Sequence, residues 1–386
     1  MSYNFDEAVV RAGSDSSKWR VYGEDVIPMW VADMDFRSPR PILDAIHERV
    51  EHAVFGYGGE SQRLQEVICE RMDRLHGWQI KPADVVLLPG LVCGLNVVSR
   101  AIGQPGDGVV VSTPVYPPFL TAPTNQGRVL QTASLAVEST AHTQRYAFDA
   151  DVFEQTIQPN TNLFILCNPH NPVGRAYTKA EMLAMAESCT RHDLVICSDE
   201  IHCDLMLDGN KHLPIATLDP QIADRTITLI APSKTFNVPG LGCSAVIVQN
   251  AELRQKVTGA ASGIVPHVNV LGIAAAIAAY TECQAWQDEL LAYLTANRDF
   301  VVNFVTEELP NLRITVPEAT YLAWIDCRAA GIEGNPYEFF LKEAKVAFND
   351  GARFGEEGKN FIRLNFGTQR ALLEEGLARV KNALHG

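Results

Sequence analysis

The chain has 386 residues, 47% of them hydrophobic and 20% charged, which is ordinary for a globular protein that buries a sizeable core. Its formal net charge of −14 repels phosphate backbones and therefore argues against nucleic acid as a partner. The opening residues, MSYNFDEAVV, lack the basic and apolar segments of a secretory signal.

Short apolar runs alternate with helical patterns through the first 280 residues. The runs are rich in β-branched residues, as are strands that are covered on both faces. They occupy residues 85–88 (VVLL), 109–111 (VVV), 163–167 (LFILC), 194–197 (LVIC), 227–230 (ITLI) and 245–248 (AVIV). Residues 179–189 predict a helix, because apolar side chains recur there at helical spacing. The alternation predicts an α/β fold with a mainly parallel central sheet flanked by helices.

The pattern changes after about residue 280. A long helical segment over 286–308 leads into candidate strands at 312–316 and 321–325, then a further helix, a strand at 361–364 and a last helix. We therefore expect a large ligand-binding domain over 46–280 and a smaller α+β domain over 281–386, with residues 1–45 packed against the smaller one. The apolar stretch 271–280 is too short to span a bilayer and predicts a buried helix.

The nine cysteines are odd in number and include no C-x-x-C pair. Cys167, Cys197 and Cys243 lie inside or beside apolar runs, where a cysteine acts as a small core residue. A disulfide framework is therefore not expected, and a cytoplasmic location fits the composition better. No metal-ligand spacing joins His170, His202 and the cysteines, so no metal site is predicted.

Polar and aromatic residues cluster where the predicted strands end. Four of the strands are followed by Tyr116, by residues 168–175 (NPHNPVGR), by residues 199–202 (DEIH), and by Ser233 with Lys234. In open α/β sheets, ligands bind beyond the carboxyl ends of the strands. The sequence therefore predicts a binding site at this edge of the sheet.

Lys234 and Asp199 are the candidates for the chemistry of this site. A lysine at a strand end beside a pocket is desolvated, which lowers its pKa and makes its amine a nucleophile towards an aldehyde. On local sequence alone, a surface lysine is an equal alternative. A carboxylate at the position of Asp199 can pair with a pyridinium nitrogen, although a loop or N-cap aspartate is the commoner role there.

Other candidates are weaker when each is taken alone. Tyr116, between prolines in TPVYPPF, could stack on a flat ring or pack in the core. Asn171, in NPHNPVG, is either a turn residue or a ligand contact. The glycine turn at 90–94 precedes a helical pattern and could bind a phosphate, as many strand–helix turns could. Arg363, amid apolar residues in FIRLNFG, predicts either a bound substrate carboxylate or a structural salt bridge.

Taken together and in their order along the chain, these motifs resemble those of the fold-type I enzymes that use pyridoxal 5′-phosphate (PLP), the aspartate-aminotransferase-like superfamily. Within it, the chain resembles the cystathionine β-lyase branch of the MalY/PatB type, often called C–S lyases. The resemblance runs from PMWVADMDF (28–36) through FGYG, TPVYPPF, NPHNPVGR, SDEIHCDL and APSKTFN to FIRLNFGT. It implies that the large domain binds PLP and that the protein is a homodimer with shared active sites.

The resemblance also implies a role for each candidate. Lys234 is the Schiff-base lysine and the base at the substrate Cα, Asp199 is the partner of the pyridinium nitrogen, and Tyr116 stacks on the ring; these three form the implied catalytic set. The resemblance further implies that Asn171 and His202 contact the phenolic oxygen of PLP, and that the amides of Val92 and Cys93, with Ser233, bind its phosphate. Tyr57 of the partner subunit is implied to contact the phosphate or the substrate. Arg363, with backbone near Ala32, is implied to bind the substrate α-carboxylate.

Two departures from the family patterns bear on activity and cofactor binding. Many aminotransferases of the superfamily have a phosphate-binding arginine eight residues after the lysine, where this chain has Gly242, and a tyrosine at the position of His202. Residues 91–94 read LVCG, where lyase relatives more often end in proline and alanine.

The first departure favours β-elimination from L-cystathionine or another cysteine S-conjugate, giving a thiol, pyruvate and ammonia. Amino transfer is the main alternative, and a PLP-binding regulatory protein with little catalysis is an alternative of another class.

Overall fold

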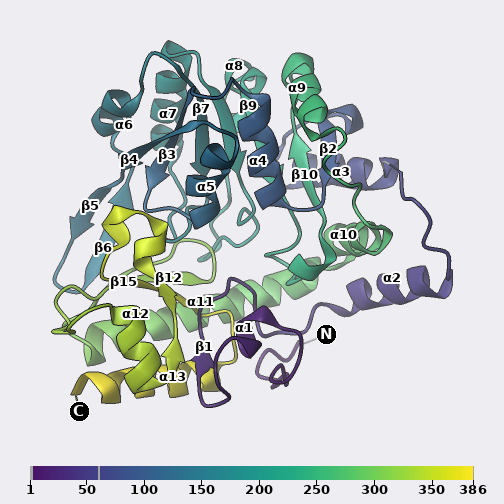
Figure 1. The fold of residues 1–386 in the computed structure, drawn as a ribbon. Helices are drawn as coiled ribbons and strands as arrows, with labels where there is room; N and C mark the ends of the chain where they lie inside the picture. The colour runs from purple at the N-terminus through teal and green to yellow at the C-terminus, as the bar shows by residue number, and fades with distance from the viewer. Residues whose placement is uncertain (1–2, 60, 386) are drawn as a thin grey trace.

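The larger of the two main sheets has seven strands and is mainly parallel (Figure 1). The structure, a computed structural model, describes residues 3–59 and 61–385. In spatial order the strands are β2 (Val85–Leu88), β10 (Ser244–Ile247), β9 (Thr226–Ile230), β8 (Val195–Asp199), β7 (Thr161–Cys167), β3 (Gly108–Thr113) and β4 (Val129–Ser134). Strand β10 is antiparallel to β2 and β9, and the strands from β9 to β4 are parallel. The predicted α/β class is confirmed.

Helices cover both faces of this sheet, because successive side chains of a strand point to opposite faces. Leu163 and Ile165 of β7 share a core with α4 (Leu91–Ala101) and α9 (Ala251–Ala261). Phe164, between them, belongs to the core on the other face, with α7 (Lys179–Arg191). This two-sided cover is the reason that the strands are continuously apolar in sequence. Helix α7 is the helix predicted over 179–189, and its buried face includes Met182, Met185, Ala186 and Cys189.

The second sheet has six strands. Their order is β14 (Asn349–Asp350), β15 (Phe361–Asn365), β12 (Leu322–Asp326), β11 (Arg313–Thr315), β6 (Thr143–Ala147) and β5 (Ala136–Ser139). Three of these strands correspond to those predicted after residue 311. Strands β5 and β6 come from the middle of the chain and were not predicted, because most of β5 is exposed and its composition is polar. In the core of this sheet, the buried Trp324 stacks on Phe361 with ring centroids 5.1 Å apart.

The remaining elements connect and cover the sheets. The longest helix is α11 (Gln284–Glu308), which packs against β11 and against α13 (Arg370–His385). The other helices are α1 (Ser17–Arg20), α2 (Arg40–Glu51), α3 (Gln62–His76), α5 (Pro117–Asn125), α6 (Ala150–Thr156), α8 (Pro220–Asp224), α10 (Val270–Glu282) and α12 (Pro336–Phe339), with short helical turns at Pro82–Asp84, Ile215–Thr217, Pro239–Leu241, Phe340–Ala344, Gly351–Phe354 and Glu356–Gly358. Among the helices that the structure describes, none has the length and apolar character needed to cross a membrane.

The N-terminal part of the chain meets the C-terminal part. Strand β1 (Ile27–Pro28) pairs in parallel with β13 (Val346–Ala347), and the segment 29–36 follows it.

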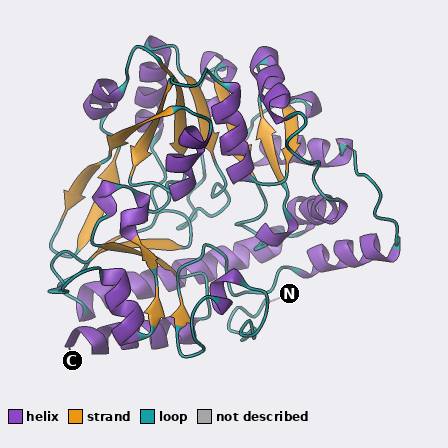
Figure 2. Cartoon of the chain, in the orientation of Figure 1, coloured by secondary structure: helices purple, strands orange, loops and turns teal. Residues whose placement is uncertain are grey.

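The carboxyl ends of the central parallel strands face the second sheet (Figure 2). Helix α2 lies at the outer edge of the molecule in Figure 1 and packs against α10. The division of the chain at residues 45 and 280 stays a prediction.

Candidate active site

The residues predicted at the strand ends line one cavity. Asp199 is the last residue of β8, Lys234 follows β9, and Asn171 follows β7. Tyr116 follows β3 and precedes α5. The predicted residues that line the cavity are Ala32, Val92, Cys93, Tyr116, Asn171, Asp199, His202, Ser233 and Lys234.

The amine of Lys234 lies against the backbone of the N-terminal segment. Its Nζ donates to the carbonyl oxygen of Ala32 at 2.6 Å, and the hydroxyl of Tyr321 donates to the same oxygen at 2.8 Å. Desolvation, together with the charge of Arg363, lowers the pKa of Lys234 to about 8. A minor fraction of the amine, far larger than that of an ordinary exposed lysine, is therefore neutral and nucleophilic near neutral pH.

The carboxylate of Asp199 is buried beside this lysine. Its Oδ1 accepts a hydrogen bond from the backbone amide of Ile201 at 3.0 Å. Burial raises the pKa of Asp199 to about 7, because the ionised form loses its hydration. A cation placed next to Asp199 would favour the ionised form, so the site suits a positively charged group such as a protonated ring nitrogen.

Arg363, in β15, is buried without a carboxylate partner among the described residues. Its Nη1 donates to Oδ1 of Asn171 at 2.9 Å, and its Nη2 donates to the carbonyl of Trp30 at 3.0 Å and to Oδ1 of Asn349 at 2.5 Å. Its buried Nε has no partner in the described part of the chain. A structural salt bridge, one of the two sequence-based alternatives, is therefore absent from these residues, and an anion could bind here.

His202 and Tyr116 form further parts of the wall. His202 is buried, its ring lies edge-on to that of Tyr321, and its Nδ1 has no partner among residues 3–59 and 61–385. Burial, with the charges of Lys234 and Arg363, lowers the pKa of His202 to about 3, so the ring is neutral. The backbone amide of Tyr116 donates to the carbonyl of Asn171 at 3.1 Å, which joins the loops that follow β3 and β7.

His170 lies behind the cavity and does not line it. Its Nε2 lies 2.7 Å from the carbonyl oxygen of Pro114, and its Nδ1 lies 3.0 Å from the hydroxyl of Tyr177. Burial lowers the pKa of His170 to about 4, so the neutral ring can donate to the carbonyl and accept from the hydroxyl. His170 therefore holds the loop that carries Tyr116.

The start of α4 offers a site for an anion. Gly90 precedes the helix, no side chain caps it, and Val92 and Cys93 lie in its first turn, facing the cavity. Backbone N–H groups in the first turn of a helix lack intrahelical partners and bind phosphates well. Gly242 lies alongside with a φ of 53°, and a Cβ there would lie 3.2 Å from the carbonyl oxygen of Pro89. Both the φ and the close approach favour glycine at this position.

Tyr57 lies outside this cavity. It follows α2, does not line the cavity, and its side chain is fully exposed, with a relative accessibility of 106%. One protomer therefore does not bring Tyr57 together with the other predicted residues.

Sequence reasoning missed three residues that shape the site. The carbonyl of Trp30 and the side chain of Asn349 hold Arg363, and Tyr321 holds the Ala32 carbonyl. Trp30 lies within the PMWVADMDF motif, which could have indicated it. Asn349 and Tyr321 stand in no motif, since their contacts join segments far apart in sequence.

The chain resembles known proteins along almost its whole length. It matches the aminotransferase class I and II family over residues 24–380. It is 40% identical to cystathionine beta-lyase PatB of Bacillus subtilis (strain 168), over 99% of this chain and 100% of that protein. Among solved structures, OvoB has a TM-score of 0.94 at 44% identity, covering 99% of each chain. The PLP-bound C–S lyase of Staphylococcus hominis has a TM-score of 0.93 at 30% identity, covering 100% of this chain and 99% of that one.

A match of this extent, on this fold, defines the class of the protein: the chain belongs to the aminotransferase class I and II family of the PLP-dependent, aspartate-aminotransferase-like enzymes. Within that family it stands with the cystathionine β-lyases, the branch of carbon–sulfur lyases to which PatB belongs. The resemblance predicted from the motifs is confirmed.

Proposed function

We propose that this enzyme binds PLP in the cavity and cleaves the Cβ–S bond of L-cystathionine or a related cysteine S-conjugate. The observation that carries the proposal is a partly neutral Lys234 amine in the cavity together with a buried Arg363 that is bonded to the lining residue Asn171 and whose Nε has no partner among the described residues. The first suits attachment to an aldehyde, and the second suits an α-carboxylate.

The cavity fits PLP group by group. The uncapped start of α4 and Ser233 would bind the phosphate, and Asp199 would pair with the ring nitrogen. Nδ2 of Asn171 and the neutral His202 would bond the phenolic oxygen, and Tyr116 would stack on the ring. The absence of an arginine at position 242 leaves the backbone amides as the main phosphate donors.

In the proposed reaction, Arg363 binds the substrate α-carboxylate and so orients Cα beside Lys234. The neutral amine of Lys234 accepts the Cα proton, which its pKa of about 8 allows near neutral pH. The chemistry that bound PLP supplies is an electron sink for the charge that develops at Cα. Asp199 stabilises that sink by holding the ring nitrogen protonated. The sulfur then leaves from Cβ and takes up a proton to give the thiol. One water molecule hydrolyses the remaining three-carbon fragment to pyruvate and ammonia.

The test is one incubation of the PLP-loaded enzyme with L-cystathionine, in which pyruvate and free thiol are both assayed. Equal amounts of the two, absent with a Lys234→Ala variant, support β-elimination. Transfer of the amino group to an added 2-oxo acid without release of a thiol would instead identify an aminotransferase. Stoichiometric PLP binding with no turnover of cystathionine or of S-alkyl cysteines would favour a regulatory protein and contradict the proposal.

We further propose a homodimer in which Tyr57 of the partner subunit completes each site. The support is the exposure of apolar side chains at the end of α2 and beyond it, at Val50, Val54, Phe55 and Tyr57. Large exposed apolar groups of this kind mark interaction surfaces more often than scattered single ones do. A cytoplasmic location is also proposed, supported by nine cysteines of which none forms a disulfide.

A further inference from the structure

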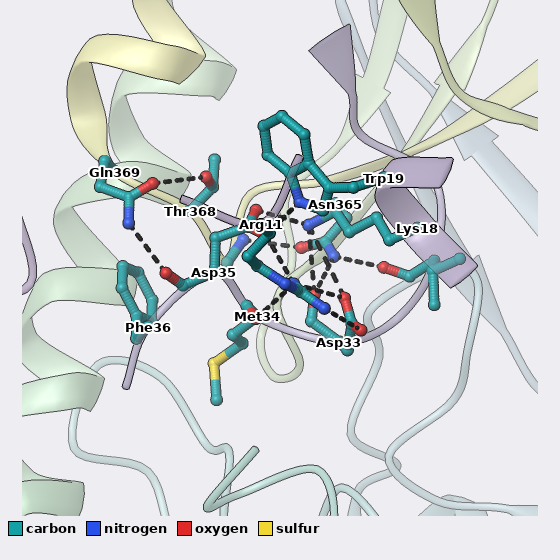
Figure 3. Close-up of polar contacts among 12 residues, drawn as sticks. Arg11, Lys18, Trp19, Asp33, Met34, Asp35, Phe36, Asn365, Thr368 and Gln369 are labelled. Atoms are coloured by element: carbon teal, nitrogen blue, oxygen red, sulfur yellow. Dashed lines mark hydrogen bonds and ion pairs between the residues drawn. The ribbon is translucent and has the colours of Figure 1, made fainter. Parts of the chain in front are cut away.

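A group of four charges, two of them buried, lies beside the N-terminal segment that lines the cavity at Ala32 (Figure 3). We call Arg11, Lys18, Asp33 and Asp35 the anchor cluster. Nζ of Lys18 lies 2.6 Å from Oδ2 of Asp35, and Nη1 of Arg11 lies 2.7 Å from Oδ1 of the same carboxylate. Nη2 of Arg11 also lies 2.9 Å from Oδ2 of Asp33. Two cations are thus balanced by two anions.

Two members of the anchor cluster are buried to an extent that is extreme for charged residues. Lys18 has a relative accessibility of 0% and Asp35 of 2%. Burial alone would raise the pKa of Asp35, but Lys18, Trp19 and Arg11 together hold that pKa below its ordinary value. Desolvating charges is costly, and well-packed apolar side chains are often as stable as a buried ion pair. What paired charges supply in addition is a fixed geometry, which indicates a positioning role for the cluster.

The cluster is attached to the carbonyl that faces Lys234. Nζ of Lys18 donates to the carbonyl oxygen of Asp33 at 3.3 Å. The side-chain nitrogen of Asn365 donates to the carbonyls of Val31 at 2.5 Å and of Asp33 at 2.7 Å, on either side of Ala32. The Ala32 carbonyl is thereby left to accept from Lys234 and Tyr321. The anchor cluster and Asn365 thus hold the backbone on either side of Ala32.

We propose that Lys18 and Asp35 are positioning residues of the active site: they hold segment 30–36 so that the Ala32 carbonyl faces the Lys234 amine and the Trp30 carbonyl faces Arg363. The proposal rests on the proposed function, since it assigns these two carbonyls to the amine that moves the proton and to the guanidinium that binds the substrate.

The contacts of segment 30–36 predict that loosening it affects substrate binding more than PLP binding. Segment 30–36 contacts Arg363, which binds the substrate, and the amine of Lys234, which moves the substrate proton and also attaches the cofactor. The start of α4 and the carboxylate of Asp199 make no hydrogen bond to this segment among the described residues. Loosening the segment should therefore weaken substrate binding and slow proton transfer, while the affinity for PLP stays close to that of the wild type.

The experiment compares Lys18→Met with Arg37→Met. The first leaves Asp35 paired with Arg11 and with the indole N–H of Trp19, so the protein should fold. The second removes a cation from the same part of the chain but breaks only an exposed pair with Glu7. Hydrogen–deuterium exchange of the apoenzyme is measured over 29–36, where the amides of Met34 and Asp35 are bonded to Asn237 and Gly367. The KM for the amino-acid substrate and the Kd for PLP are measured on the same proteins.

For Lys18→Met we expect hydrogen exchange over 29–36 to become about tenfold faster and KM to rise about tenfold, the size of effect expected for the loss of one charge-assisted hydrogen bond. The Kd for PLP should change less than about twofold. Arg37→Met should match the wild type. Unchanged exchange and KM in a folded Lys18→Met protein would overturn the proposal, as would parallel losses of substrate and PLP affinity.

If Lys18→Met does not fold, Trp19→Phe provides the same test, because it removes only the hydrogen bond to Asp35 and keeps an aromatic ring. The exchange measurement needs neither PLP nor turnover. It therefore still decides whether the cluster holds the segment if the wild-type enzyme shows no lyase activity, which would contradict the proposed function instead.

Discussion

Arg363 donates from Nη1 to the side-chain oxygen of Asn171 across 2.9 Å, and this contact joins the proposed carboxylate-binding residue to a residue that lines the cavity. It also fixes the orientation of the amide: with Oδ1 held by the guanidinium, Nδ2 of Asn171 is the group left to donate. A phenolic oxygen is an acceptor, so this orientation suits the proposed contact with PLP.

Asn171→Ala should therefore weaken binding of both ligands, whereas Arg363→Ala should affect mainly the substrate. We expect Asn171→Ala to raise the PLP Kd and the substrate KM by about tenfold each, since each loses one hydrogen bond to a charged group. Arg363→Ala should raise KM about a hundredfold with little change in PLP Kd. Equilibrium PLP titration and steady-state kinetics measure both. An unchanged KM in Arg363→Ala would remove the carboxylate role from this residue.

Lys234→Ala should abolish covalent attachment of PLP and lower turnover by roughly a thousandfold, because it removes both the nucleophile and the proton acceptor. Borohydride reduction followed by peptide mass spectrometry locates the modified residue. Lys179→Ala, which removes an exposed lysine at the start of α7, is the control and should behave like the wild type. Retention of a reducible PLP adduct in Lys234→Ala would show that another lysine carries the cofactor.

The buried carboxylate of Asp199 should make the apoenzyme less stable as pH rises. Its pKa is raised from 3.8 to about 7, so between these values the folded chain binds more protons than the unfolded chain. Stability therefore falls as pH rises through this window. The apo forms of the wild type and of Asp199→Asn are compared by urea unfolding at pH 5 and pH 8. We expect the wild type to lose a few kcal/mol relative to the variant between the two pH values, and a constant difference would contradict the pKa.

Tyr57 should act across a dimer interface. A Tyr57→Ala protomer and a Lys234→Ala protomer are each expected to be impaired alone. Co-expressed, they form mixed dimers in which one of the two sites has both native residues, so the activity of the mixed dimer should recover to as much as about half of the wild type. The mixed species is isolated with two affinity tags. Isolated mixed dimers that are no more active than either parent would place Tyr57 outside the partner's site.

Much of the fold followed from the apolar pattern because the central strands are covered on both faces. Residues 85–88, for instance, coincide with β2, and 227–230 lie within β9. Strand β5 is mostly exposed and β6 is fully buried only at alternate positions, so this hairpin has no such pattern and its pairing with β11 could not be predicted. Its place in the second sheet depends on a contact with a segment about 170 residues further along the chain, which no local signal reports.

The site was predictable where residues follow strands, and unpredictable where they meet across the chain. Asp199 and Lys234 could be found because strand ends point to one edge of a parallel sheet. The unpaired Nε of Arg363 and the roles of Asn349 and Tyr321 required the packed structure. Lys18 lies in a polar stretch, so the sequence did not indicate that it is buried. Its burial depends on the ion pair with Asp35, which only the folded structure reveals.

Segment 27–36 pairs with residues 346–347 and 365–369, and this pairing determines which parts of the protein can fold first during translation. The segment is made near the start of translation, yet its partners follow about 330 residues later, on the order of half a minute at ribosomal speed. The last strand of the seven-stranded sheet ends at residue 247, well before those partners exist. A nascent chain can thus form the seven-stranded sheet, with the site residues at its strand ends, before segment 27–36 has its C-terminal partners. During that interval Lys234 is open to a cofactor molecule from solution.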